Sequence, residues 1–155
     1  MPELRPLALS VVACHAVAAT LDRLVPPGHG ARTLRVAPDE TLFVAPAGVA
    51  DDVAREVADR VAALEPDALV LDVTDGWAAW SLAGPGAQRA FSYLSALTPP
   101  EAGGFVQGDV ARVGAKVLAE PGGGLTILVP AYWREHLRER VLHDARATEP
   151  EATAP

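Results

Sequence analysis

The chain has 155 residues, half of them hydrophobic and 21% charged, which suits a soluble globular protein that can bury a core. Its formal net charge of −7 at pH 7 argues against nucleic acid as the main partner, because binding to phosphates needs a basic surface. Cys14 is the only cysteine, which excludes a disulfide within the chain and a Cys-x-x-Cys metal motif.

These features predict a cytoplasmic protein with no membrane partner. A lone cysteine fits a reducing compartment, and no apolar run is long enough for a membrane-spanning helix. The first apolar stretch loosely resembles a signal peptide, but Glu3 and Pro6 stand where basic residues would be expected and His15 interrupts it. A strand followed by a short helix is the favoured interpretation of this segment.

The first half of the chain is predicted to have the element order β-α-β-β-α-β. Its clearest helix is 49–64, where valines recur every four residues from Val49 to Val61 and charged side chains occupy the other face. Pro66 ends this helix. The other expected elements are a strand at 7–13, a helix at 16–24, a hairpin of strands 33–36 and 40–45, and a continuous apolar strand at 68–72 that should be central and covered on both faces.

The second half is predicted to have the order β-α-β-β-β-α. Asp75-Gly76 is a hairpin-type turn before a strand at 77–82, and Gly84-Pro85 opens a helix that runs to about Leu97. After a Pro- and Gly-rich loop at 98–107, strands are expected at 109–113, 116–120 and 125–129, with Gly114 as the tight link between the first two and 122–124 as the next turn. The last helix, 131–147, should bury Trp133, Leu137 and Val141 as its stripe.

This pattern predicts a single α+β domain at residues 7–147, built from two packed halves at about 7–72 and 77–147. The first half has the order of a split β-α-β, ferredoxin-like unit, and the second is a variation on it. Residues 148–155 are rich in Pro, Glu and Ala and are expected to be a disordered tail.

No sequence motif makes a complete catalytic or cofactor site. Gly84 to Arg89 fits G-x-G-x-x-G only in part, because Arg89 replaces the third glycine, so a plain helix start is favoured. His136 and His143 are seven residues apart, whereas helical metal ligands usually stand three or four apart, so no metal site is expected.

Asp72 and Asp75 flank the turn at the middle of the chain. Paired carboxylates can do acid–base chemistry, but the favoured interpretation is structural: Asp72 hydrogen-bonds turn amides and Asp75 begins the Asp-Gly turn. Trp77 and Trp80 stand three apart on the next strand and point to opposite faces, so one should lie in the core. An exposed tryptophan would be a candidate interface residue.

The middle of the chain resembles a known family. Leu71-Asp72-Val73-Thr74-Asp75-Gly76-Trp77 and Ser81-Leu82-Ala83-Gly84-Pro85-Gly86-Ala87 are similar to the "D-[VL]-S-[DH]…L-S-G-P-x-A" signature of the gamma subunit of heterotetrameric sarcosine oxidase. Val36 to Pro46 resembles its "L-G-P-D-E-W-L-L-V-A-P" segment, and the collinear resemblance extends over roughly 7–145. The family usually has an arginine where this chain has Trp77.

The resemblance implies the fold of the folate-binding domain of the glycine-cleavage T protein and an accessory, non-catalytic role in oxidative demethylation of sarcosine or a related N-methyl amine. The partners would be larger flavoprotein subunits, which would hold FAD, FMN, NAD and tetrahydrofolate, while this chain binds no cofactor. Interface candidates are Trp77, Trp80 and Trp133.

Two other functions stay open at this stage. A stand-alone enzyme or binding protein of the folate-domain fold would use Asp72, Asp75, Trp77 and Arg112 as candidate pocket residues. A scaffold unrelated to amine oxidation is the third possibility.

Overall fold

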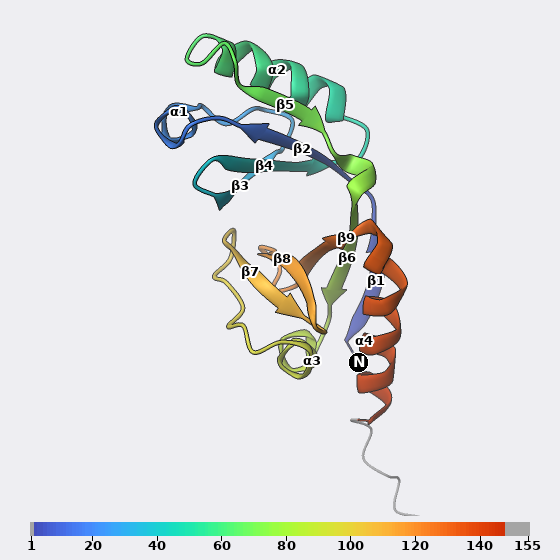
Figure 1. The fold of residues 1–155 in the computed structure, drawn as a ribbon. Coiled ribbons are helices and arrows are strands. Elements are labelled where there is room, and N and C mark those ends of the chain that lie inside the picture. The colour runs from blue at the N-terminus through green and yellow to red at the C-terminus, as the bar shows by residue number, and fades with distance from the viewer. Residues whose placement is uncertain (1, 148–155) are drawn as a thin grey trace, which may run out of the picture. The chain divides into compact units, whose positions relative to one another are not determined.

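The computed structural model describes residues 2–147, so the predicted tail at 148–155 lies outside the described residues (Figure 1). Within this range the contacts divide the chain into two compact units. One, which we call the inserted unit, is Ala8–Trp77; the other, the outer unit, combines residues 2–7 with residues 78–147. Each unit has its own sheet and its own apolar core. No described helix is both long enough and apolar enough to cross a membrane.

The inserted unit has the predicted element order. Its elements are β2 (Leu9–His15), α1 (Ala18–Arg23), β3 (Arg32–Ala37), β4 (Glu40–Pro46), α2 (Ala50–Ala62), β5 (Leu69–Asp72) and the 3₁₀ turn η1 (Thr74–Gly76). The strands form a sheet in the order β3-β4-β2-β5, and every neighbouring pair is antiparallel. The predicted hairpin at 33–45 is therefore confirmed as β3 and β4.

Helix α2 confirms the prediction from valine spacing. Val53, Val57 and Val61 are almost completely buried and pack in one cluster with Val12 and Phe43 of the sheet. Burying each valine stabilises the unit by roughly 1.5–3 kcal/mol, which exceeds the modest helix propensity of valine. The cluster fixes this helix, and therefore its first turn, against the sheet.

Strand β5 corrects two predictions. It lies at the edge of its sheet instead of the centre, and its Leu69 and Leu71 side chains are 51% and 41% exposed. A continuous apolar run is typical of a central strand, but it does not determine which neighbours the strand has. The Asp75-Gly76 turn is also no hairpin, because η1 connects β5 to a strand of the other sheet.

The outer unit holds the remaining elements. They are β1 (Glu3–Leu7), β6 (Trp77–Ala83), α3 (Ala87–Leu94), β7 (Phe105–Val110), β8 (Val113–Ala119), β9 (Leu125–Pro130), the 3₁₀ turn η2 (Ala131–Trp133) and α4 (Arg134–Ala147). The sheet order is β1-β6-β9-β8-β7. From β6 onward the order β-α-β-β-β-α is as predicted. The core includes Trp80, Leu82, Phe91, Ile127 and Leu137.

Strand β1 was not predicted. The expected strand at 7–13 is in fact two strands, one ending at Leu7 and one beginning at Leu9, which belong to different sheets. β1 tolerates Pro6 because it is an edge strand, where a missing backbone N–H costs little. Pro6 lies opposite Trp80 in the antiparallel pair of β1 with β6.

Two helix predictions for this unit need correction. Helix α3 ends at Leu94 instead of Leu97, because Ser95 is extended and its hydroxyl donates to the carbonyl of Asp109 at 2.6 Å. Trp133 is 39% exposed and does not join Leu137 and Val141 in the core, since η2 precedes α4 and changes the phase of the helical stripe.

The turn between β7 and β8 also differs from the prediction. β7 begins at Phe105, within the expected loop, and the turn falls at Ala111-Arg112 instead of Gly114. Both turn residues have positive φ, 52° and 66°, as two-residue hairpin turns often require. Asn or Gly usually marks such a turn, so neither Ala111 nor Arg112 gave a signal.

Candidate functional site

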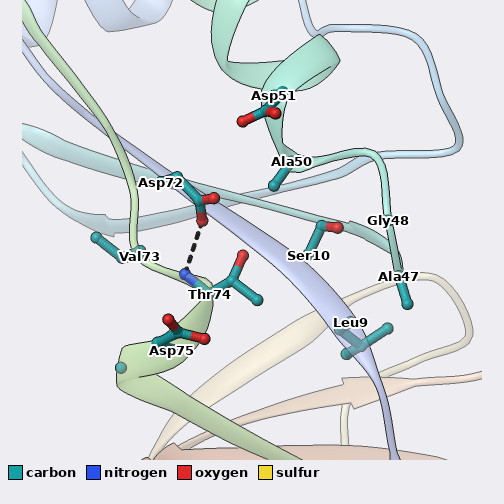
Figure 2. A pocket seen from close by; sticks show the side chains of 11 residues that line it. Leu9, Ser10, Ala47, Gly48, Ala50, Asp51, Asp72, Val73, Thr74 and Asp75 are labelled. Carbon is teal, nitrogen blue, oxygen red and sulfur yellow. Dashed lines mark hydrogen bonds between the residues drawn. The ribbon is translucent and has the colours of Figure 1, made fainter.

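The inserted unit contains an open pocket of about 640 Å³ (Figure 2). Three segments line it: the start of β2, the loop and first turn that begin α2, and the end of β5 with η1. The cluster of buried valines holds α2 against the sheet, and β5 pairs with β2, so the three segments are fixed relative to one another. All the lining residues belong to the inserted unit.

Thr74 ties two walls of this pocket together. Its hydroxyl oxygen accepts a hydrogen bond from the Val11 N–H at 3.0 Å, and its backbone N–H donates to Oδ1 of Asp72 at 2.9 Å, the dashed line in Figure 2. The backbone N–H of Val73 donates to the Val11 carbonyl at 2.9 Å and continues the β5–β2 pairing. Asp72 therefore makes the bond to a turn amide that the sequence favoured.

Hydrogen bonds from Thr74 stabilise the ionised form of Asp72. The side chain of Thr74, followed by its backbone N–H, holds the pKa of the Asp72 carboxyl below its ordinary value, and slight burial opposes this effect. The carboxyl is thus ionised at neutral pH and acts as an acceptor. A general acid would need a raised pKa, so this geometry suits Asp72 to binding more than to proton donation.

A second hydroxyl organises the opposite wall. Ser10 is buried at 2% exposure, and its Oγ accepts a hydrogen bond from the Val49 N–H at 3.2 Å, just before the first turn of α2. Asp51 lies in that first turn, where a carboxylate complements the helix dipole. Together with Ser10, this arrangement leaves the start of α2 polar on the side of the pocket.

The pocket is acidic. Figure 2 shows three carboxylates around it, Asp51 on α2, Asp72 at the end of β5 and Asp75 on η1, and no basic residue is among those lining it. Such a surface accepts hydrogen bonds from amino or amine groups and repels anions. Among the residues that the structure describes, no three His, Cys, Asp or Glu side chains are placed to hold one metal ion.

The predicted pocket residues have different positions. Asp72 and Asp75 both line the pocket, and Trp77 follows η1 directly and is half-buried. Arg112 is exposed on the β7–β8 turn of the outer unit. Their role as ligand contacts stays a prediction.

The interface candidates also differ in exposure. Trp80 lies in the core of the outer unit at 4% exposure, whereas Trp133 is 39% exposed. Trp77 and Trp80 fall on opposite faces of β6, as expected from their spacing. Little of the Trp80 side chain is therefore left for a partner to contact.

Three polar residues that line the pocket were not predicted as site residues, namely Ser10, Asp51 and Thr74. Thr74 had a usable signal, because an aspartate two residues earlier is the pattern of an Asx-turn. Ser10 had none, since its partner Val49 is 39 residues away in the chain.

Comparison with known proteins gives the fold. No family model matches the sequence, and no curated protein matches it. A chain of the heterotetrameric sarcosine oxidase from Corynebacterium sp. U-96, solved with pyrrole 2-carboxylate, superposes with a TM-score of 0.80 at 17% identity, covering 99% of this chain and 88% of that one. The chain shares the fold of this subunit.

Two further structures have the same architecture in part. The glycine cleavage system aminomethyltransferase T from Bartonella henselae matches with a TM-score of 0.67 at 17% identity, over 94% of this chain but only 46% of that one. The regulatory subunit of aspartate kinase from Thermus thermophilus matches with a TM-score of 0.50 at 15% identity, over 94% and 97% of the two chains. The α+β fold resembling the T protein is thus confirmed, and identities this low show the fold alone.

Proposed function

We propose that this chain is an accessory, non-catalytic subunit of a heterotetrameric amine oxidase that resembles sarcosine oxidase. The observation that carries the proposal is the near-complete superposition on a chain of that enzyme, with a TM-score of 0.80 and coverage of 99% and 88%. The aminomethyltransferase, by contrast, has more than half of its chain outside the match. The match thus extends over most of a chain of the oxidase, which favours a subunit role for this fold.

In this proposal the redox chemistry belongs to the partner subunits. The substrate would be sarcosine or a related N-methyl amine, and the larger flavoprotein subunits would hold FAD, FMN, NAD and tetrahydrofolate in the cytoplasm. The partial glycine motif of this chain fits that division, because Gly86 serves as the N-cap of α3 and Arg89 stands where a dinucleotide-binding motif has its third glycine. This chain would contribute a folded surface for assembly.

The ferredoxin-like character of the halves belongs to the same proposal. We infer that the inserted unit is a split β-α-β unit, and its antiparallel sheet order β3-β4-β2-β5 supports this. The outer unit would be its variant, with β1 as an added edge strand. Such paired units are the architecture expected of the folate-binding-domain fold.

Co-purification tests the proposal. The tagged chain is expressed in its own organism, and the proteins that remain bound after size-exclusion chromatography are identified by mass spectrometry and by flavin absorbance. We expect larger flavoprotein subunits in stoichiometric amounts, together with sarcosine-dependent oxygen consumption. Recovery of the chain as a monomer with no flavoprotein would refute the assignment.

One observation favours a second function, a folate-fold enzyme or binding protein that acts alone. The pocket brings Asp72 and Asp75 together, two of the residues proposed for a folate-type site, and their carboxylates can accept hydrogen bonds from the amino and ring N–H groups of a pterin. Calorimetry of the isolated chain with tetrahydrofolate tests this function. Saturable heat that is lost in an Asp72→Asn, Asp75→Asn double variant supports it, and absence of heat at high folate concentration excludes it.

A further inference from the structure

Three aromatic rings form a contiguous surface where α4 begins in the outer unit. Tyr132 and Trp133 have ring centroids 5.5 Å apart at 49°, and Trp133 meets His136 edge-on at 5.3 Å and 68°. Tyr132 is 80% exposed and Trp133 is 39% exposed. Large aromatic side chains this exposed are uncommon on a surface that only meets water, and they are enriched at protein interfaces.

His136 joins these rings to the turn between β7 and β8. Its Nε2 lies 2.9 Å from the carbonyl oxygen of Ala111. A carbonyl oxygen only accepts, so Nε2 carries the proton and donates. On the other side of the turn the Ala111 N–H donates to the Leu94 carbonyl at 2.7 Å.

These bonds hold Arg112 outward. Ala111 and Arg112 have left-handed φ values of 52° and 66°, which are costly for residues with a Cβ and persist only where neighbours fix them. Arg112 is exposed beside a turn that is fixed from two sides. Its position is therefore determined by the fold.

The charge of this surface is opposite to that of the chain. Arg112 and Arg134 are exposed, and neither side chain forms an ion pair or hydrogen bond with another described residue. Arg138, one turn further along α4, is paired with Glu135 at 3.3 Å. Two arginines without a carboxylate partner, on a chain of net charge −7, form a local basic site.

We propose that Tyr132, Trp133, His136, Arg112 and Arg134, here called the aromatic–arginine patch, dock a partner subunit through a segment that carries carboxylates beside an apolar side chain. The proposal rests on the proposed function as an accessory subunit and names the surface that this function uses. Tyr, Trp and Arg dominate binding energy at interfaces, and they do so where a rigid, desolvated aromatic centre is surrounded by polar groups. The contacts among the three rings and the fixed β7–β8 turn restrict these side chains before binding, which lowers the entropic cost of association.

Charge complementarity selects the occupant. A second copy of this chain would bring the same arginines against each other, whereas carboxylates on a partner would pair with Arg112 and Arg134 and accelerate association. The aromatic rings would contribute through slow dissociation, because their contacts with the partner form only in the docked complex. The two kinds of residue thus predict two different kinetic effects.

The test measures binding of the intact chain to the purified flavoprotein subunits by biolayer interferometry. Tyr132→Ala should weaken the affinity about tenfold or more through faster dissociation. Arg112→Glu should weaken it mainly through slower association, and this effect should shrink as salt is raised from about 50 to 500 mM. The matched control is the Arg89→Ala, Tyr93→Ala variant, which removes an exposed arginine and tyrosine from α3 of the same unit. Circular dichroism confirms that each variant is folded.

The outcomes separate this inference from the proposed function. If the wild-type chain binds the flavoprotein subunits and the patch variants bind equally well, the patch has no role while the subunit assignment stands. If the wild-type chain does not bind them, the assignment fails and the named partner with it. If sedimentation shows a dimer of the isolated chain that Tyr132→Ala dissociates, the occupant is a second copy and the proposal is overturned.

Discussion

Replacing Thr74 by valine tests the reasoning about the pocket, because it removes one hydroxyl and keeps the shape of the side chain. The Thr74 hydroxyl accepts from the N–H of Val11, a residue that is 2% exposed. In the valine variant this N–H loses its acceptor while its residue stays buried. Leaving a buried donor unpaired costs about 1–3 kcal/mol, while the unchanged volume adds no cavity.

We therefore expect Thr74→Val to lower the free energy of unfolding by about 2 kcal/mol. For a chain of this size that corresponds to a fall in Tm of about 4–8 °C. Urea unfolding followed by circular dichroism measures it, with the midpoint lowered and the slope unchanged. Thr74→Ser is the matched control, since it keeps the oxygen.

Two results would contradict this account. If the valine variant unfolds at the wild-type urea concentration, the Val11 N–H does not depend on Thr74. If Thr74→Ser, which keeps the hydroxyl but loses the methyl group, is destabilised as much as Thr74→Val, the change in the valine variant cannot be assigned to the hydrogen bond.

Three other predictions follow from burial and charge. The pKa of Asp72 in the folded chain lies below its ordinary value, so the stability lost in Asp72→Ala should be constant above about pH 4 and should vanish as the pH falls through the folded pKa. Urea titrations from pH 7 to pH 2 measure this loss. A stability difference between wild type and variant that grows in acid would contradict the prediction. Phe91→Ala should lower the free energy of unfolding by about 3–5 kcal/mol, because the ring is fully buried. Tyr93→Ala, on the exposed face of the same helix, should change it by less than about 0.5 kcal/mol. Equal effects of the two variants in thermal melts would show that α3 does not pack as described. Burial of the Cys14 thiol, aided by the negative charge of Glu65, raises its pKa. A disulfide reagent should therefore react with Cys14 far more slowly in the native chain than in denaturant. Equal reaction rates would place the thiol at the surface.

The helices show what the sequence can determine. α2 was predictable because its valines repeat with the helical period, and that period is a local property of the chain. α4 was predictable only in part, because Trp133 has the right spacing to Leu137 but belongs to a 3₁₀ turn that a period count does not detect. The periodic pattern identified the existence of each helix better than its first residue.

Strands depend more on distant neighbours. Nothing in Leu69–Asp72 tells whether one or two strands pair with it, so its edge position could not be predicted. The candidate pocket has the same limit. Asp72 and Asp75 were identified because the turn that holds them is local, whereas the Val11–Thr74 bond joins residues 63 positions apart.

The pairing of β1 with β6 has a consequence for the order of folding during synthesis. Residues 3–7 leave the ribosome well before their partners, residues 79–83, and the whole inserted unit is made between them. The inserted unit is continuous in sequence and can fold as soon as Trp77 has emerged, while β1 must wait unpaired for a contact of high sequence separation. Closure of the outer sheet is thus a late event, and an N-terminal fusion that hinders β1 would affect this sheet and leave the inserted unit able to form.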